Sequence, residues 1–158
     1  MRTLIVYFSK FGNTRKLAEV MAETMKQAGE ARVTAIDQLS ANDFEGVDLV
    51  VMGTPTHGFT VPQEVRVVLD ALPLSILTGR SVAAFDTTVR WWPLRRLRAS
   101  PKLLARLTHL GGRRLARPET FFVRTKGKHE TPEPNLLVEG ELDRARQWAA
   151  RLAEQLRA

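Results

Sequence analysis

The chain has 158 residues, of which 44% are hydrophobic and 26% are charged, and these are the proportions of an ordinary folded domain. The length predicts a single domain over residues 1–158 that buries a core without disulfides or metals. The absence of cysteine excludes a disulfide scaffold, a thiolate metal site and a cysteine nucleophile. No apolar run reaches the roughly 18 residues of a membrane span, and the N-terminus lacks a signal-peptide pattern, so a cytoplasmic location is expected.

The net charge of +7 comes from one part of the chain. Nine of the 24 lysines and arginines, and none of the 17 acidic residues, lie between Arg90 and Arg117. A concentrated charge indicates a partner, whereas a scattered excess reflects only solubility. This basic segment therefore needs an interpretation of its own.

The first half of the chain alternates strand and helix patterns. Residues 3–8 (TLIVYF) form a continuous apolar run, which is typical of a strand covered on both faces. Apolar residues at spacings of three and four predict a helix over residues 14–28, ended by Gly29. Residues 32–36 and 49–52 are the next two predicted strands, and Gly53 is expected to break the latter.

The second half continues the alternation. Pro62 suits a first helical turn and opens a predicted helix over residues 62–72, and residues 81–85 (SVAAF) predict a strand. Ser100 is the expected N-cap of a helix that two glycines close after residue 110. Residues 120–124 predict the fifth strand, and an apolar stripe over 142–156 predicts the last helix.

This order of elements predicts an α/β fold, a parallel sheet with helices on both faces joined by right-handed crossovers. In such open sheets ligands bind beyond the carboxyl ends of the strands. The loops after the first, third and fourth strands are therefore the places to search for a site.

The loop after the first strand reads SKFGNT and leads into the N-terminus of a helix. Hydroxyls, an amide side chain and free helix N–H groups can surround a phosphate here, the helix dipole favours the anion, and the glycine permits the turn. The alternative is that Asn13 or Thr14 merely caps the helix. The candidate phosphate-binding residues are Ser9, Lys10, Phe11, Gly12, Asn13 and Thr14.

This loop resembles the phosphate loop of the flavodoxin family, and the resemblance extends to the loop after the third strand (GTPTHGF) and to the order of elements over nearly the whole chain. It implies a three-layer, doubly wound, five-stranded parallel sheet of strand order 2-1-3-4-5. It also implies flavin mononucleotide (FMN) as cofactor, its phosphate in the first loop and its ring between the loops after the third and fourth strands.

In the loop after the third strand, the resemblance places His57, Gly58 and Phe59 along one face and edge of the flavin. The Gly58 peptide is expected to flip and offer its carbonyl to the reduced ring, a change that glycine makes easily. A plain turn before Pro62 is the alternative, and His57 is assigned to binding only. No side chain is given a catalytic role. The candidates in this loop are Thr54, Pro55, Thr56, His57, Gly58 and Phe59.

In the loop after the fourth strand, Trp91 is the first choice for stacking on the outer flavin face, and Trp92 competes with it. The alternative is that both tryptophans pack under the following helix, since tryptophan is readily buried. The candidates in this loop are Asp86, Thr87, Thr88 and Trp91.

The charge near the site departs from the acidic surroundings that flavodoxins give their flavin. Asp86 is the only acidic residue of the three loops, so positive potential is expected to favour the reduced anion and make the redox potential less negative. A basic rim is also expected to steer the protein towards a redox partner with an acidic surface. The basic residues concerned are Lys10, Arg90, Arg95, Arg96 and Arg98.

The favoured function is an electron-transfer protein whose FMN shuttles one or two electrons, rather than an enzyme with its own substrate. One alternative is a flavin-dependent oxidoreductase acting on a quinone or porphyrinogen, because a menaquinone-linked protoporphyrinogen oxidase shares this fold and meets the membrane. Another is a non-redox binding module that uses the basic segment 90–117. For that segment a solvated face is favoured over peripheral contact with a membrane of anionic lipid, and over contact with nucleic acid.

Overall fold

The computed structural model describes residues 1–56, 60–90, 98–124 and 136–158, in which strands and helices alternate as predicted. The strands are β1 (Arg2–Tyr7), β2 (Glu30–Ala35), β3 (Leu49–Pro55), β4 (Ser81–Val89), β5 (Arg113–Arg114) and β6 (Glu119–Val123). The α-helices are α1 (Asn13–Lys26), α2 (Gln63–Ala71), α3 (Ala99–His109) and α4 (Glu141–Arg157). Two short 3-10 helices, η1 (Ile36–Gln38) and η2 (Ala41–Phe44), follow β2.

The strands form one parallel sheet in the order β2-β1-β3-β4-β5, with β6 also paired to β4. The predicted order 2-1-3-4-5 is confirmed. The fifth position is shared, because β5 pairs with the start of β4 at Ser81 and Val82, whereas β6 pairs with its end from Phe85 to Val89. The split strand is a feature that the sequence pattern did not predict.

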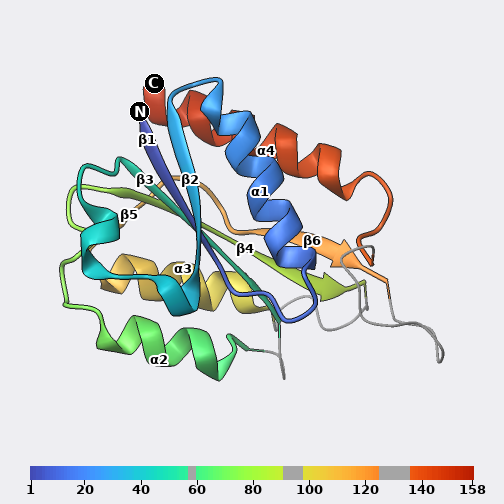
Figure 1. Cartoon of the computed structure of the whole chain (residues 1–158), viewed down its shortest axis with the longest axis horizontal. Helices are drawn as coiled ribbons and strands as arrows, with labels where there is room; N and C mark the ends of the chain where they lie inside the picture. Colours follow the sequence, from blue (N-terminus) through green and yellow to red (C-terminus); the bar gives the residue numbers. More distant parts are fainter. Residues whose placement is uncertain (57–59, 91–97, 125–135) are drawn as a thin grey trace.

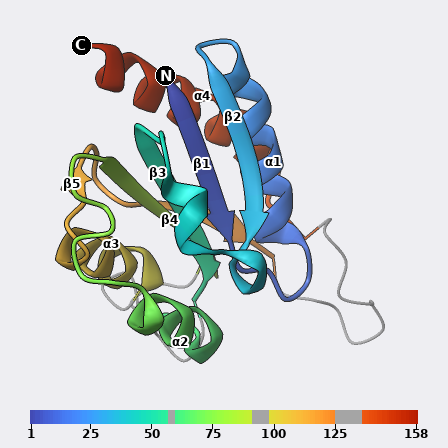
Figure 2. The ribbon, with the colours of Figure 1, turned by 60° about the vertical axis from the view of Figure 1, so that its left-hand side comes forward.

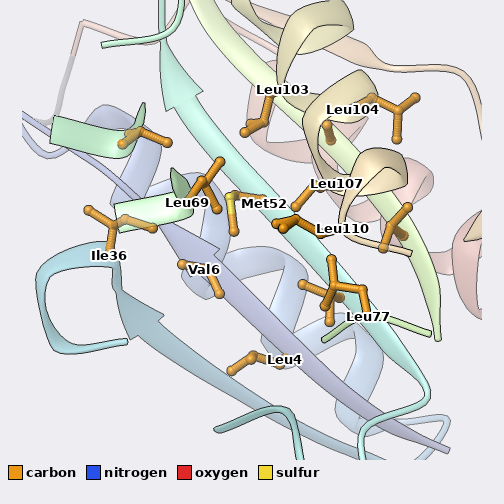
Figure 3. Packing of buried hydrophobic residues seen from close by; sticks show 14 of the residues in the cluster. Leu4, Val6, Ile36, Met52, Leu69, Leu77, Leu103, Leu104, Leu107 and Leu110 are labelled. Atoms are coloured by element: carbon orange, nitrogen blue, oxygen red, sulfur yellow. The ribbon is translucent and has the colours of Figure 1, made fainter. Parts of the chain in front are cut away.

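Two helices cover each face of the sheet (Figures 1 and 2), α1 and α4 on one side and α2 and α3 on the other. Successive side chains of a strand point to opposite faces, so each buried strand feeds both cores. Leu4, Val6 and Met52 pack with Leu69 of α2 and with the leucines of α3 (Figure 3). Ile5, Val51 and Phe85 pack on the other side with α1 and α4. Such two-sided burial explains the continuous apolar runs of β1 and β3.

A close approach inside the second core makes Gly53 necessary. A Cβ atom on Gly53 would lie 2.0 Å from the ring of Phe85, so only glycine leaves room for that ring. Phe85 in turn meets Phe121 and Trp148 edge-to-face, with ring centroids 5.8 and 6.1 Å apart. The prediction that Gly53 ends the third strand was wrong, because β3 runs through Gly53 to Pro55.

Two other boundaries also differ from the expected ones. β4 continues past Phe85 to Val89, so Asp86, Thr87 and Thr88 lie in a strand rather than in a loop. α3 begins at Ala99 with Arg98 as N-cap, before the expected cap Ser100. Within the described ranges, no helix combines the length and the apolar character needed to cross a membrane.

Candidate functional site

A pocket of about 290 Å³ opens at the carboxyl edge of the sheet, where β1, β3, β4 and β6 end. The connection from β1 to α1 lies at this edge, beside the end of β4 (Figure 1). Of the predicted residues, the structure brings nine to the pocket wall. They are Ser9, Lys10, Phe11, Asn13, Thr14, Pro55, Thr56, Thr87 and Thr88.

The loop before α1 is held in a tight turn around Gly12. This residue has φ 91° and ψ −7°, the left-handed conformation in which glycine is unstrained. Its N–H donates to Ser9 Oγ at 2.9 Å, which closes the turn. No side chain of the described residues caps the N-terminus of α1. The first amides of the helix are thus left for a ligand, and the alternative that Asn13 or Thr14 caps the helix is wrong.

Two polar side chains of the loop are buried in the pocket wall. Thr14 is 2% exposed, and its hydroxyl oxygen lies 3.1 Å from that of Thr87 at the end of β4. Asn13 is 7% exposed, and its Oδ1 has no hydrogen-bond partner among the described residues. A buried amide oxygen without a partner is costly, so a ligand hydroxyl that donates to it would stabilise the site. With the amide turned over, its NH2 would donate to a phosphate.

The N-terminus of α3 contrasts with that of α1, because its amides are already bonded. Ala99 N–H donates to Thr56 Oγ1 at 3.1 Å, and Ser100 N–H donates to Asp86 Oδ2 at 2.8 Å. The Thr56 hydroxyl also donates to the same carboxylate oxygen, at 3.2 Å. These bonds from distant strands explain why α3 begins before Ser100. No side chain of the described residues caps α1 in this way, and its N-terminus opens on the pocket.

Three predicted residues lie beside the pocket without lining it. Gly12 shapes the loop, and Thr54 is fully buried with its hydroxyl donating to the carbonyl of Pro55. Asp86 is also fully buried; its Oδ2 accepts from Ser100 of α3 and from Thr56, and its Oδ1 has no partner among the described residues. The predictions for His57, Gly58, Phe59, Trp91, Trp92, Arg95 and Arg96 lie outside the described residues.

Four lining residues were missed by the sequence analysis: Val89, Val123, Arg124 and Leu136. Val89 belongs to the unforeseen extension of β4. Val123 and Arg124 stand at the end of β6, and since the carboxyl ends of parallel strands share one edge, the predicted fifth strand could have indicated them. Leu136 had no such signal.

A hydrogen-bonded ion-pair network holds β6 in place beside the pocket. Arg144 of α4 donates to Glu119 and Glu141, with N–O distances of 2.7 to 2.9 Å, and it also donates to the carbonyl of Thr120. Phe122 N–H donates to Glu141 at 2.6 Å. The hydrogen bonds to the Glu141 carboxylate raise the pKa of Arg144. The last helix is thereby fastened to the strand that forms one pocket wall.

Comparison with known proteins agrees with this geometry. The family model described as Flavodoxin matches residues 5–150 of the chain. A flavodoxin of Clostridium saccharobutylicum is 30% identical over 92 residues, which cover 55% of this chain and 56% of that protein. A flavodoxin of Aquifex aeolicus is 25% identical over 95 residues, covering 57% of this chain and 51% of that protein. The chain thus spans about half the length of the curated relatives that it matches.

The fold is also that of known flavodoxin structures. A flavodoxin from the domain Archaea superposes with a TM-score of 0.79 and 14% identity, each chain covered completely. Because the residues matched by the family model run from β1 into α4, the likeness takes in the whole sheet and the pocket at its edge. The chain belongs to the flavodoxin family.

Proposed function

We propose that the chain is an FMN-binding electron-transfer protein whose β1–α1 loop holds the phosphate of the cofactor. The observation that carries this proposal is the N-terminus of α1, which no described side chain caps and which opens on the pocket at Asn13 and Thr14. The N-terminus of α3, by contrast, is bonded to Thr56 and Asp86. A terminus whose amides are free and whose dipole favours negative charge suits a phosphate. When bound, FMN supplies the redox chemistry, and the protein supplies position and electrostatics.

The residues present fit this cofactor. Ser9, Asn13 and Thr14 surround the helix amides with hydroxyl and amide groups, and Thr87 meets the loop from β4. The wall beyond them, with Pro55 and Val89, is more apolar and suits a flat ring. We assign phosphate binding to the loop and ring contact to the ends of β3 and β4. The sequence-based assignments of His57, Gly58, Phe59 and Trp91 to the ring stay predictions.

An absorption titration with FMN tests the proposal directly. Purified protein should take up FMN at micromolar concentration, with a shift of the flavin absorption bands and quenching of its fluorescence. Riboflavin, which lacks the phosphate, should bind more weakly, because it leaves the amides of α1 unpaired. Failure to bind FMN would overturn the proposal and favour the non-redox binding module instead.

We also propose that the flavin of this protein has a less negative potential than that of acidic flavodoxins. Lys10 and Arg124 line the pocket, no acidic side chain is among its described lining residues, and Asp86 is bonded to α3. Positive potential near the ring favours the reduced anion. Redox titration of the loaded protein should show this, and the potential should become more negative in Lys10→Gln. A potential as low as that of acidic flavodoxins would contradict the idea.

We propose an electron carrier rather than an enzyme with a quinone or porphyrinogen substrate, because FMN itself supplies the redox chemistry and the chain belongs to the flavodoxin family. Steady-state assays with a quinone and with a porphyrinogen check this choice. Turnover with either would favour the enzyme. A cytoplasmic location stays a prediction.

A further inference from the structure

Two arginine side chains meet over one aromatic ring next to the pocket. Arg90 directly follows β4, Arg98 directly precedes α3, and their guanidinium carbons lie 5.0 and 5.4 Å from the ring centroid of Phe122 in β6. Both distances are within the range of cation–π contact. Phe122 is the neighbour of Thr88 in the β4–β6 register, so the ring stands beside the end of β4.

These two arginines differ from the third cation at the ring. Arg144 lies 5.8 Å from the same centroid, but Glu119 and Glu141 pair with it. No ion pair between described residues includes Arg90 or Arg98, and the nearest acid in the sequence, Asp86, is buried and bonded to α3. Two like charges held at one ring repel each other. An anion bound between them would relieve this repulsion, so binding of an anion is favoured here.

The pair stands at the rim of the pocket. Val89, just before Arg90, is 43% exposed and lines the pocket, and Val123, just after Phe122, lines it too. We call Val89, Arg90, Arg98 and Phe122 the arginine rim. It joins an exposed apolar side chain to two arginines, and aromatic and arginine side chains are enriched in protein interfaces.

We infer that the arginine rim is the docking surface for a redox protein that presents carboxylates around its electron-exchange site. A guanidinium stacked on a ring keeps its N–H edge free, and this edge matches a carboxylate in bidentate geometry. A partner bound here would meet the pocket at Val89 and so approach the flavin. This inference rests on the proposed function for the identity of the partner, but the surface itself is defined without the cofactor.

A charge-reversal experiment tests the inference with a fluorescent hexaglutamate peptide as the probe. Arg90→Glu with Arg98→Glu should weaken binding of the peptide on the order of tenfold and reduce its dependence on salt. The matched control is Arg114→Glu with Arg151→Glu, which changes the net charge equally on β5 and α4. Amide NMR shifts induced by the peptide should centre on residues 90, 98 and 122.

The measurements are made with and without FMN, so that the two proposals can fail separately. Peptide binding that both double variants weaken equally overturns the docking surface, whatever FMN does. Peptide binding at the rim in a protein that takes up no FMN overturns the electron-transfer proposal and with it the redox identity of the partner, but it supports the rim as a docking surface for carboxylates. Tighter binding through Arg90 and Arg98 of anionic phospholipid vesicles, or of single-stranded DNA, also overturns the inference. If the reversed variant does not fold, Arg90→Gln with Arg98→Gln serves in its place and should give a smaller loss in the same direction.

Discussion

The hydroxyl oxygens of Thr14 and Thr87 lie 3.1 Å apart, which ties the first turn of α1 to the end of β4 across 73 positions of the chain. Both side chains are buried in the wall of the pocket. The contact fixes the β1–α1 loop, to which the proposed function assigns the phosphate, against the strand to which it assigns the flavin ring.

Replacing Thr14 with valine, which keeps the shape and removes the hydroxyl, should weaken FMN binding by about tenfold to a hundredfold, the range for a hydrogen bond to a charged group. Fluorescence titration gives the dissociation constant. Thr24→Val is the matched control, because Thr24 lies in the same helix and bonds only to the carbonyl of Val20 among the described contacts. An unchanged affinity in Thr14→Val would remove this residue from the phosphate site.

Replacing Gly12 with alanine should destabilise the FMN-free protein by roughly 1–2 kcal/mol, because a Cβ is strained at φ 91°. Gly12→Asn should lose less, since asparagine tolerates the left-handed conformation. Urea unfolding measures both losses. Equal losses of stability in the two variants would show that glycine is needed at position 12 for lack of space for a side chain, and not for the backbone angle.

Replacing Asp86 with alanine should lower the free energy of unfolding by about 2–3 kcal/mol, because the Ser100 N–H and the Thr56 hydroxyl lose their shared acceptor. Asp86→Asn keeps one oxygen there and should cost less. The loss should appear in urea unfolding without FMN. A stable Asp86→Ala variant that has only lost FMN affinity would instead restore the sequence-based expectation that this residue contacts the cofactor.

Asp43 gives the protein a pH-dependent contribution to stability. Hydrogen bonds from the backbone N–H and the hydroxyl of Ser40, with the nearby Arg32 guanidinium, hold the pKa of Asp43 below its ordinary value of 3.8. Because the pKa is lower in the folded protein than in the unfolded chain, the ionised carboxylate stabilises the fold at any pH above the pKa of the unfolded chain. This stability is lost as the pH falls through the pKa of the folded protein.

Asp43→Asn should therefore be less stable than the wild type at neutral pH, by about 1 kcal/mol at this partly exposed position. The difference should narrow as the pH falls below the ordinary value of 3.8. Thermal unfolding at a series of pH values gives both curves. A difference that stays constant down to the acid limit would show that the charge of Asp43 is not the cause.

The elements that the sequence predicted well are those with strong local patterns. The apolar runs of β1 and β3 and the apolar stripes of the helices reflect burial. Each of these patterns can be recognised within the segment itself, without knowledge of its neighbours in the fold. β5 had no such signal, because Arg113 and Arg114 are exposed. They are held by backbone pairing with β4 and by the Arg113 side chain, which donates to Ser81 Oγ at 2.9 Å. The early start of α3 depends on Thr56 and Asp86, which lie far from it in the sequence.

The site was predicted in the same uneven way. The polar loop before α1 could be singled out from local sequence, because hydroxyl, amide and glycine residues stand together where a strand leads into a helix. Asp86 was expected beside the flavin because it followed a predicted strand, but in the structure its carboxylate bonds to the Thr56 hydroxyl and to the Ser100 N–H of α3. Its burial is a tertiary fact that a single sequence does not display.

The pocket draws its wall from segments that begin at Ser9 and end at Leu136, so an N-terminal fragment that stops before β6 lacks part of it. During synthesis the β1–α1 loop emerges early, yet the pocket wall is completed only after most of the chain has left the ribosome. Cofactor capture is then a late event in the life of the chain. FMN bound in this pocket would therefore stabilise only molecules in which β6 has already joined the sheet.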